Sequence, residues 1–103
     1  MTYQLVLQLV GDTPRDLDAV VALEDDLAIA VGQEAEVDGH DIGSGQANIF
    51  ILTREPLDTF ARLRPTLVAR DLLSCARIAY RAIDGDSYAV LWPEEFAGGF
   101  QVL

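Results

Sequence analysis

A short polar stretch rich in glycine carries the side chains most capable of chemistry. Residues 38–48 read DGHDIGSGQAN and combine three glycines with two aspartates and the only histidine of the chain, His40. Carboxylate and imidazole groups are metal ligands, and glycine-rich loops can hold phosphates. The stretch therefore has three roles to compare: a phosphate site, a metal site or a turn of the chain.

The stretch lacks the features of a phosphate-binding loop. A Walker loop ends in Gly-Lys followed by Ser or Thr, but here Gly45 is followed by Gln46. A dinucleotide fingerprint opens a helix, whereas this stretch leads into ANIFIL, whose composition favours a strand. Asp38 and Asp41 would also repel a phosphate. We therefore expect no nucleotide here.

A metal site is the second role. Asp38, His40 and Asp41, with Glu34 or Glu36 nearby, could supply oxygen and imidazole ligands. Their spacing matches no calcium motif, and one histidine without cysteine partners is a weak transition-metal site. We favour a structural role, in which the glycines give positive φ angles to a long hairpin turn. Replacing His40 should then change stability little.

The N-terminal part of the chain predicts a strand and a helix. YQLVLQLV, residues 3–10, alternates with the period of a half-buried strand. Residues 12–31 predict a helix with Asp12 or Thr13 as N-cap, Pro14 in its first turn and Gly32 as its stop.

The remaining pattern completes an α+β order. QEAEV and ANIFILT predict two strands that form a hairpin around the glycine stretch, taken as a loop from Asp38 to Gly45. Residues 54–73 predict a helix that begins at Pro56 and is kinked or broken at Pro65. SCARIAYRAI and SYAVLWP predict a last hairpin around Asp84-Gly85.

This order predicts one domain over residues 1–103, a ferredoxin-like α+β plait. The expected arrangement is β-α-β-β-α-β with an additional C-terminal strand. Both helices would cover one face of an antiparallel sheet. The other face would be open, and a homodimer could form through it.

Charge restricts the class of partner. Seventeen acids and seven arginines give a net charge of −10, which opposes binding to nucleic acids and to anionic membranes. No apolar run is long enough to cross a bilayer, and the N-terminus lacks the pattern of a signal peptide, so we expect a cytoplasmic protein. The single cysteine, Cys75, is expected to be a small apolar residue near the core.

The acids are unevenly distributed. Residues 1–47 hold ten acids and one arginine, whereas residues 48–103 hold seven acids and six arginines. Without a linker between these halves, the asymmetry predicts two sides of one domain. We expect one acidic surface that binds a basic protein, formed by Asp16, Asp18, Asp25, Asp26, Glu34, Glu36, Asp38 and Asp41.

Glu24 interrupts the apolar stripe of the first helix, whose other members are Leu17, Val20, Leu27 and Val31. If buried, its carboxylate needs donors, and the amides of the glycine stretch, Arg77 and Arg81 are candidates. If the helix is slightly rotated, Glu24 reaches water at the edge of the stripe. A general acid–base role would need a second group, for which the sequence offers only Tyr80, His40 and Asp41.

Two stretches, residues 36–53 and 80–93, carry a resemblance. EVDGHDIGSGQANIFILT and YRAIDGDSYAVLWP resemble a pattern in small, functionally uncharacterised bacterial proteins of ferredoxin-like type. The resemblance implies a shared shape and brings no activity, cofactor or catalytic residue to this chain.

These observations favour a non-catalytic protein-interaction module, of the immunity or inhibitor kind, that needs no cofactor. A plait domain that senses a small molecule at a strand edge or dimer interface is one alternative. A metal-dependent enzyme that uses the glycine stretch is another.

Overall fold

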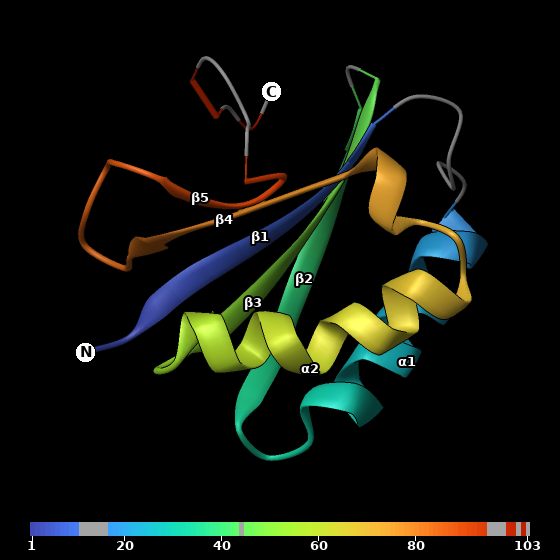
Figure 1. Ribbon diagram of the computed structural model, residues 1–103, viewed down its shortest axis with the longest axis horizontal. Coiled ribbons are helices and arrows are strands. Elements are labelled where there is room, and N and C mark those ends of the chain that lie inside the picture. Colours follow the sequence, from blue (N-terminus) through green and yellow to red (C-terminus); the bar gives the residue numbers. More distant parts are fainter. Residues whose placement is uncertain (11–16, 44, 95–98, 101, 103) are drawn as a thin grey trace.

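The computed structural model describes residues 1–10, 17–43, 45–94, 99–100 and 102, which form five strands, two α-helices and a short 3-10 helix (Figure 1). In chain order these are β1 (Tyr3–Val10), α1 (Leu17–Val31), β2 (Ala35–Gly43), β3 (Gln46–Thr53), α2 (Pro56–Ala69), η1 (Leu73–Cys75), β4 (Ala76–Ala82) and β5 (Ala89–Trp92).

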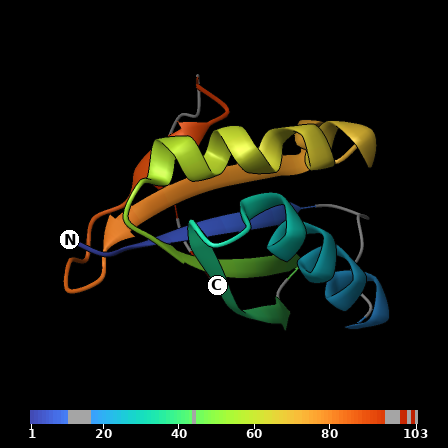
Figure 2. The ribbon, with the colours of Figure 1, turned by 90° about the horizontal axis from the view of Figure 1, so that it is seen from below.

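The sheet is antiparallel with strand order β2-β3-β1-β4-β5. Both helices pack on one face, where their buried side chains meet Leu5, Leu7 and Leu9 of β1 in one core. α1 contacts β2, whereas α2 runs alongside β4 (Figure 2). The predicted ferredoxin-like plait with an additional C-terminal strand is therefore confirmed.

The core stripe of α1 differs slightly from the predicted one. Its buried residues are Val20, Leu23, Leu27 and Val31, whereas Leu17 is 56% exposed. The stripe is centred between Leu23 and Leu27, which puts Glu24 at its edge. Gly32 ends the helix as predicted, with φ of 60° and its N–H donating to Ala28 O at 3.1 Å. The proposed N-cap residues and Pro14 lie outside the described residues.

The glycine stretch forms strand for most of its length, and the predicted loop from Asp38 to Gly45 is wrong. β2 pairs with β3 from Ala35 to Gly43, with one register shift between Val37 and Gly39. β3 is largely buried and offers β2 a complete ladder of backbone partners, which outweighs the low strand propensity of glycine. The predicted hairpin is confirmed, with Gly45 in its turn at φ of 77°.

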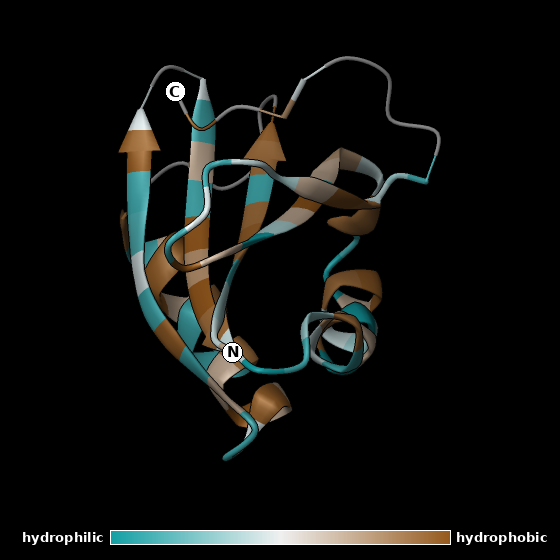
Figure 3. Ribbon diagram, turned by 90° about the vertical axis from the view of Figure 1, so that its left-hand side faces the viewer, coloured by the Kyte–Doolittle hydropathy of each residue, from teal (hydrophilic) through white to brown (hydrophobic). Residues whose placement is uncertain are grey.

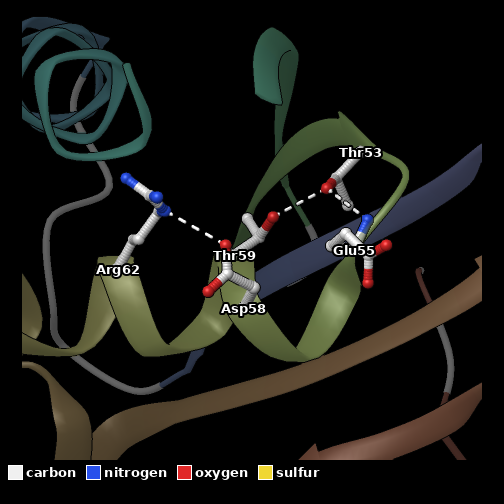
Figure 4. A network of polar contacts seen from close by, with 5 residues as sticks. All are labelled: Thr53, Glu55, Asp58, Thr59 and Arg62. Carbon is white, nitrogen blue, oxygen red and sulfur yellow. Dashed lines mark hydrogen bonds and ion pairs between the residues drawn. The ribbon is translucent and has the colours of Figure 1, made fainter. Parts of the chain in front are cut away.

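The start of α2 is fixed by a threonine pair that follows β3 (Figure 4). The hydroxyl of Thr53 accepts the Glu55 N–H at 3.0 Å and lies 2.7 Å from the hydroxyl of Thr59. Pro56 opens the helix as predicted. Arg62 donates to Asp58 one turn before it, at 3.2 Å.

Pro65 does not break α2, which continues through it to Ala69. Leu63 and Leu67 on either side of the proline are fully buried. Their packing holds the helix together across the missing backbone hydrogen bond. Of the two predicted outcomes, a kink or a break at Pro65, the break into two shorter helices is therefore wrong.

The end of α2 forms a Schellman motif. The Leu72 N–H donates to Leu67 O at 2.8 Å, and the Asp71 N–H donates to Val68 O at 3.1 Å. Asp71 adopts φ of 58° in the position that glycine usually occupies. Cys75 closes η1 rather than starting a strand, and it packs against the core with its thiol donating to Leu72 O at 3.1 Å.

The sheet face opposite the helices is not open at its centre. Val6, Gln8, Asn48 and Ala79 are at most 1% exposed within the single chain. The amide of Gln8 donates to Asn48 Oδ1 and Gln46 Oε1, each at 3.1 Å. The expected dimer surface is therefore covered here. Among the described residues no helix is long and apolar enough to cross a membrane.

Candidate functional site

Glu24 and His40 form a pair between α1 and β2. The Nδ1 atom of His40 lies 2.8 Å from Oε1 of Glu24, and the two side chains are 29% and 14% exposed. A carboxylate oxygen can only accept, so this geometry places the imidazole proton on Nδ1. Glu24 thus lies at the edge of the apolar stripe, and its hydrogen-bond donor is His40 of the glycine stretch.

A β-bulge decides that His40 meets Glu24. Simple alternation from Val37, which lies on the helix side opposite Ile51, would direct residue 40 to the far side of the sheet. The register shift leaves Asp38 as the additional residue, so that His40 pairs with Ile49 of the core face. The shift therefore brings the imidazole to the helix layer, beside α1.

The pair by itself is a limited chemical unit. A carboxylate that orients an imidazole is part of many acid–base sites, but such sites also need a reacting group beside the free ring nitrogen. Asp41 pairs with Asn48, so the register places it on the opposite face from His40. Within the described ranges no three His, Cys, Asp or Glu side chains are close enough to hold a metal ion.

The two arginines considered as partners of Glu24 lie on the wrong face of the sheet. Arg77 and Arg81 pair with Gln8 and Gln4 of β1, whose side chains point away from the helices. Arg81 donates to Gln4 Oε1 at 3.1 Å and to the carbonyl oxygens of residues 82, 83 and 85. Its guanidinium also lies 6.0 Å from the ring of Tyr88. The alternating pattern of β4 fixes this orientation.

The proposed acidic residues are mostly exposed, and they follow α1 and the edge strand β2. Figure 3 shows hydrophilic segments recurring along β2. The exposed members are Asp18, Asp25, Glu34, Glu36, Asp38 and Asp41. Asp16 lies outside the described residues.

These acids do not all share one face. Glu36 and Asp41 pair with Leu52 and Asn48, so the register directs them to the sheet face opposite the helices. Asp18 and Asp25 belong to the helix layer. The acids therefore surround the edge formed by α1 and β2, and we call Asp18, Asp25, Glu34, Glu36, Asp38 and Asp41 the acidic edge.

Asp26 belongs to an ion pair and not to the acidic edge. Arg70, which caps the C-terminus of α2, donates through Nε to Asp26 Oδ2 at 3.0 Å and contacts the same oxygen through its terminal nitrogen. The pair joins α1 to the C-terminal end of α2 through two residues that are 44 positions apart in sequence. It neutralises the Asp26 carboxylate locally.

Several arginines are engaged on the other side of the molecule. Arg62 pairs with Asp58, and the guanidinium of Arg64 lies 4.9 Å from the ring of Trp92. Arg77 and Arg81 belong to β4, which the sheet order separates from β2 by two strands. The arginines of β4 thus lie two strands away from the acids of β2, whereas Arg54 lines the same depression as Glu34 and Glu36.

The sequence pattern did not reveal a groove between α1 and α2. It is open to solvent, has a volume of about 430 Å³, and is lined by Asp26, Ile29, Ala30, Pro65, Thr66, Ala69 and Arg70. Ile29 is 80% exposed at this groove. The sequence feature that could have indicated this groove is Ile29 itself, an isoleucine that lies outside the core stripe of α1 and one turn after Asp25.

No family model, curated protein or solved structure matches the chain.

Proposed function

We propose that the chain is a non-catalytic protein-interaction module whose acidic edge binds a basic protein. The observation that carries the proposal is the separation of charge across the sheet. Exposed carboxylates follow α1 and β2 at one edge, while the arginines of α2 and β4 are held by acids, aromatic rings and carbonyl oxygens.

The geometry of the acids suits recognition of a large partner. They lie on α1, on the edge strand β2 and in the turn between them, so a small ligand could contact only a few of them at once. A basic protein that meets this edge gains long-range attraction, which speeds its association. Inhibitor and immunity proteins that cap a basic surface act in this way, and we place the chain in that class.

Charge reversal tests the proposal. Asp25→Lys with Asp38→Lys alters the acidic edge, while Asp86→Lys with Glu94→Lys alters exposed acids elsewhere. Each double variant reverses two charges and so changes the net charge from −10 to −6. The comparison therefore separates the position of the charge from its total.

The measurement is affinity capture from lysate of the cells that make the protein, followed by identification of what is retained. We expect a basic protein to be retained by the parent chain and the Asp86/Glu94 variant at about 50 mM salt. The Asp25/Asp38 variant and washing at about 500 mM salt should release it, because screening shortens the range of attraction. Equal retention by both variants would contradict the proposal.

A further inference from the structure

We propose that the groove between α1 and α2 is a docking site for a basic amphipathic helix of the partner protein. This inference rests on the proposed function, and it adds the kind of segment that is recognised and the residue that anchors it. The apolar contact would be made at Ile29 and the charged contacts at Asp25 and Asp18.

The first argument is the placement of Ile29. Asp18, Asp25 and Ile29 are separated by seven and four residues, so they follow one another along the outward face of α1. Ile29 is the most exposed large hydrophobic residue within the described helices and strands. A large apolar side chain that follows two exposed carboxylates along the same helix face matches a ligand with apolar and basic residues on one face.

The second argument is the shape beside Ile29. Ala30, Pro65 and Ala69 leave a groove between the helices that a side chain from a partner can enter. The Asp26–Arg70 pair borders the same groove, and because each charge is already matched, it neither attracts nor repels a basic segment strongly. The net attraction therefore comes from Asp25 and Asp18 on the α1 side.

The third argument concerns the conformation of the ligand. Apart from Pro65, which has no N–H to donate, the backbone groups along α1 and α2 are bonded within their own helices, so this surface offers no ladder for an incoming strand. Recognition must then use side chains that project in a row from one face. A helix presents such a row at positions i, i+3, i+4 and i+7.

A second copy of this chain fits the groove less well. Two chains would bring their carboxylates together, since each carries a net charge of −10 and Asp25 lies one turn before Ile29 of the groove on the same helix. A basic helix gains attraction from the same charges.

The test uses a synthetic helix-forming peptide of leucine and lysine, with the leucines aligned on one face, and a scrambled peptide of the same composition. Binding to the full chain is measured by fluorescence anisotropy at about 50 and 500 mM salt. Ile29→Ser removes the apolar anchor. Leu57→Ser is the matched control, because Leu57 is also a helical residue and is 66% exposed, but it does not line the groove.

We expect Ile29→Ser to weaken binding of the aligned peptide by about tenfold at both salt concentrations, as loss of an interface anchor does. Leu57→Ser should change the affinity less than about twofold. Ala69→Gln, which fills the groove without adding charge, should also weaken binding. Each variant is checked by its unfolding transition, so that a loss of binding is not a loss of fold.

The outcomes separate the two proposals. Equal effects of Ile29→Ser and Leu57→Ser, or equal binding of both peptides, would overturn the groove site and leave the acidic edge intact. If Glu36→Lys with Asp38→Lys, which alters acids of the edge that the groove does not use, has no effect on capture of the basic protein while Ile29→Ser does, the acidic edge fails and the groove site stands. Dimerisation of the parent chain that Ile29→Ser abolishes, seen by sedimentation, would show a second copy in the groove and overturn the inference.

Discussion

The imidazole of His40 lies 2.8 Å from the carboxylate of Glu24 and so joins the edge strand β2 to the helix α1. Because β2 has only one neighbouring strand in the described sheet, its position depends on β3 and on contacts with the helix layer. The Glu24–His40 pair is one of those contacts. This geometry revises the expectation that His40 contributes little to stability.

Glu24→Ala and His40→Ala should each lower the free energy of unfolding by about 0.5–1.5 kcal/mol, the usual range for a partly buried hydrogen bond. The double variant should lose less than the sum, because either change alone already removes the contact. Urea denaturation of the four proteins measures this coupling. Asp41→Ala is the control, since Asp41 is exposed and lies on the other face of β2. Strictly additive losses would show that the pair contributes nothing.

Gly45→Val should destabilise the protein by about 1–3 kcal/mol, because a β-branched residue is strained at a φ of 77°. Gly43→Val provides the comparison at a strand position. There an added Cβ meets no atom within 4 Å, and φ is not in the left-handed region. The midpoints of urea unfolding should therefore differ clearly between these variants. Equal midpoints would mean that the turn at Gly45 is not required.

Asp71→Gly should stabilise the protein by about 0.5–1 kcal/mol, because glycine adopts the left-handed conformation of the Schellman motif without strain. Thermal unfolding should then shift upward by about 2–8 °C for a domain of this size. Ser74→Gly, an exposed neighbour without a positive φ, should not stabilise. A lower melting temperature for Asp71→Gly would show that the aspartate side chain stabilises the fold by more than the left-handed backbone at this position destabilises it.

Asn48→Ala should lower the free energy of unfolding by about 1–3 kcal/mol, because it removes a buried acceptor of the Gln8 amide and leaves a cavity. Gln33→Ala, at an exposed position after α1, should change stability by less than about 0.5 kcal/mol. Chemical denaturation distinguishes the two. A small loss of stability in Asn48→Ala would indicate that water replaces the contacts of Asn48 and that the sheet face opposite the helices opens readily.

The order of elements and the class of fold follow from local patterns in the amino-acid sequence. Alternation over residues 3–10, the apolar stripe that ends at Gly32 and the turn residues near 44 and 84 are local signals, and each depends on neighbours within a few residues. Because these signals agreed, the order β-α-β-β-α-β-β and its antiparallel sheet could be predicted. The continuity of α2 through Pro65 and the length of β2 could not be predicted. Packing of Leu63 and Leu67 overrides the local preference of proline, and pairing with β3 overrides that of the glycines in β2.

Which polar groups meet depends on how distant elements pack together. A bulge after Val37 turned His40 towards Glu24, Arg70 reached Asp26 across 44 residues, and Arg81 was directed to the face opposite Glu24. A one-residue shift in register exchanges the two faces of a strand, and the sequence carries no local signal for such a shift. The groove beside Ile29 likewise exists only where two helices that are distant in sequence pack together. Side-chain partners at long range follow from the packing of whole elements. The sequence pattern therefore offered His40 as one of three possible second groups for Glu24 but could not select it.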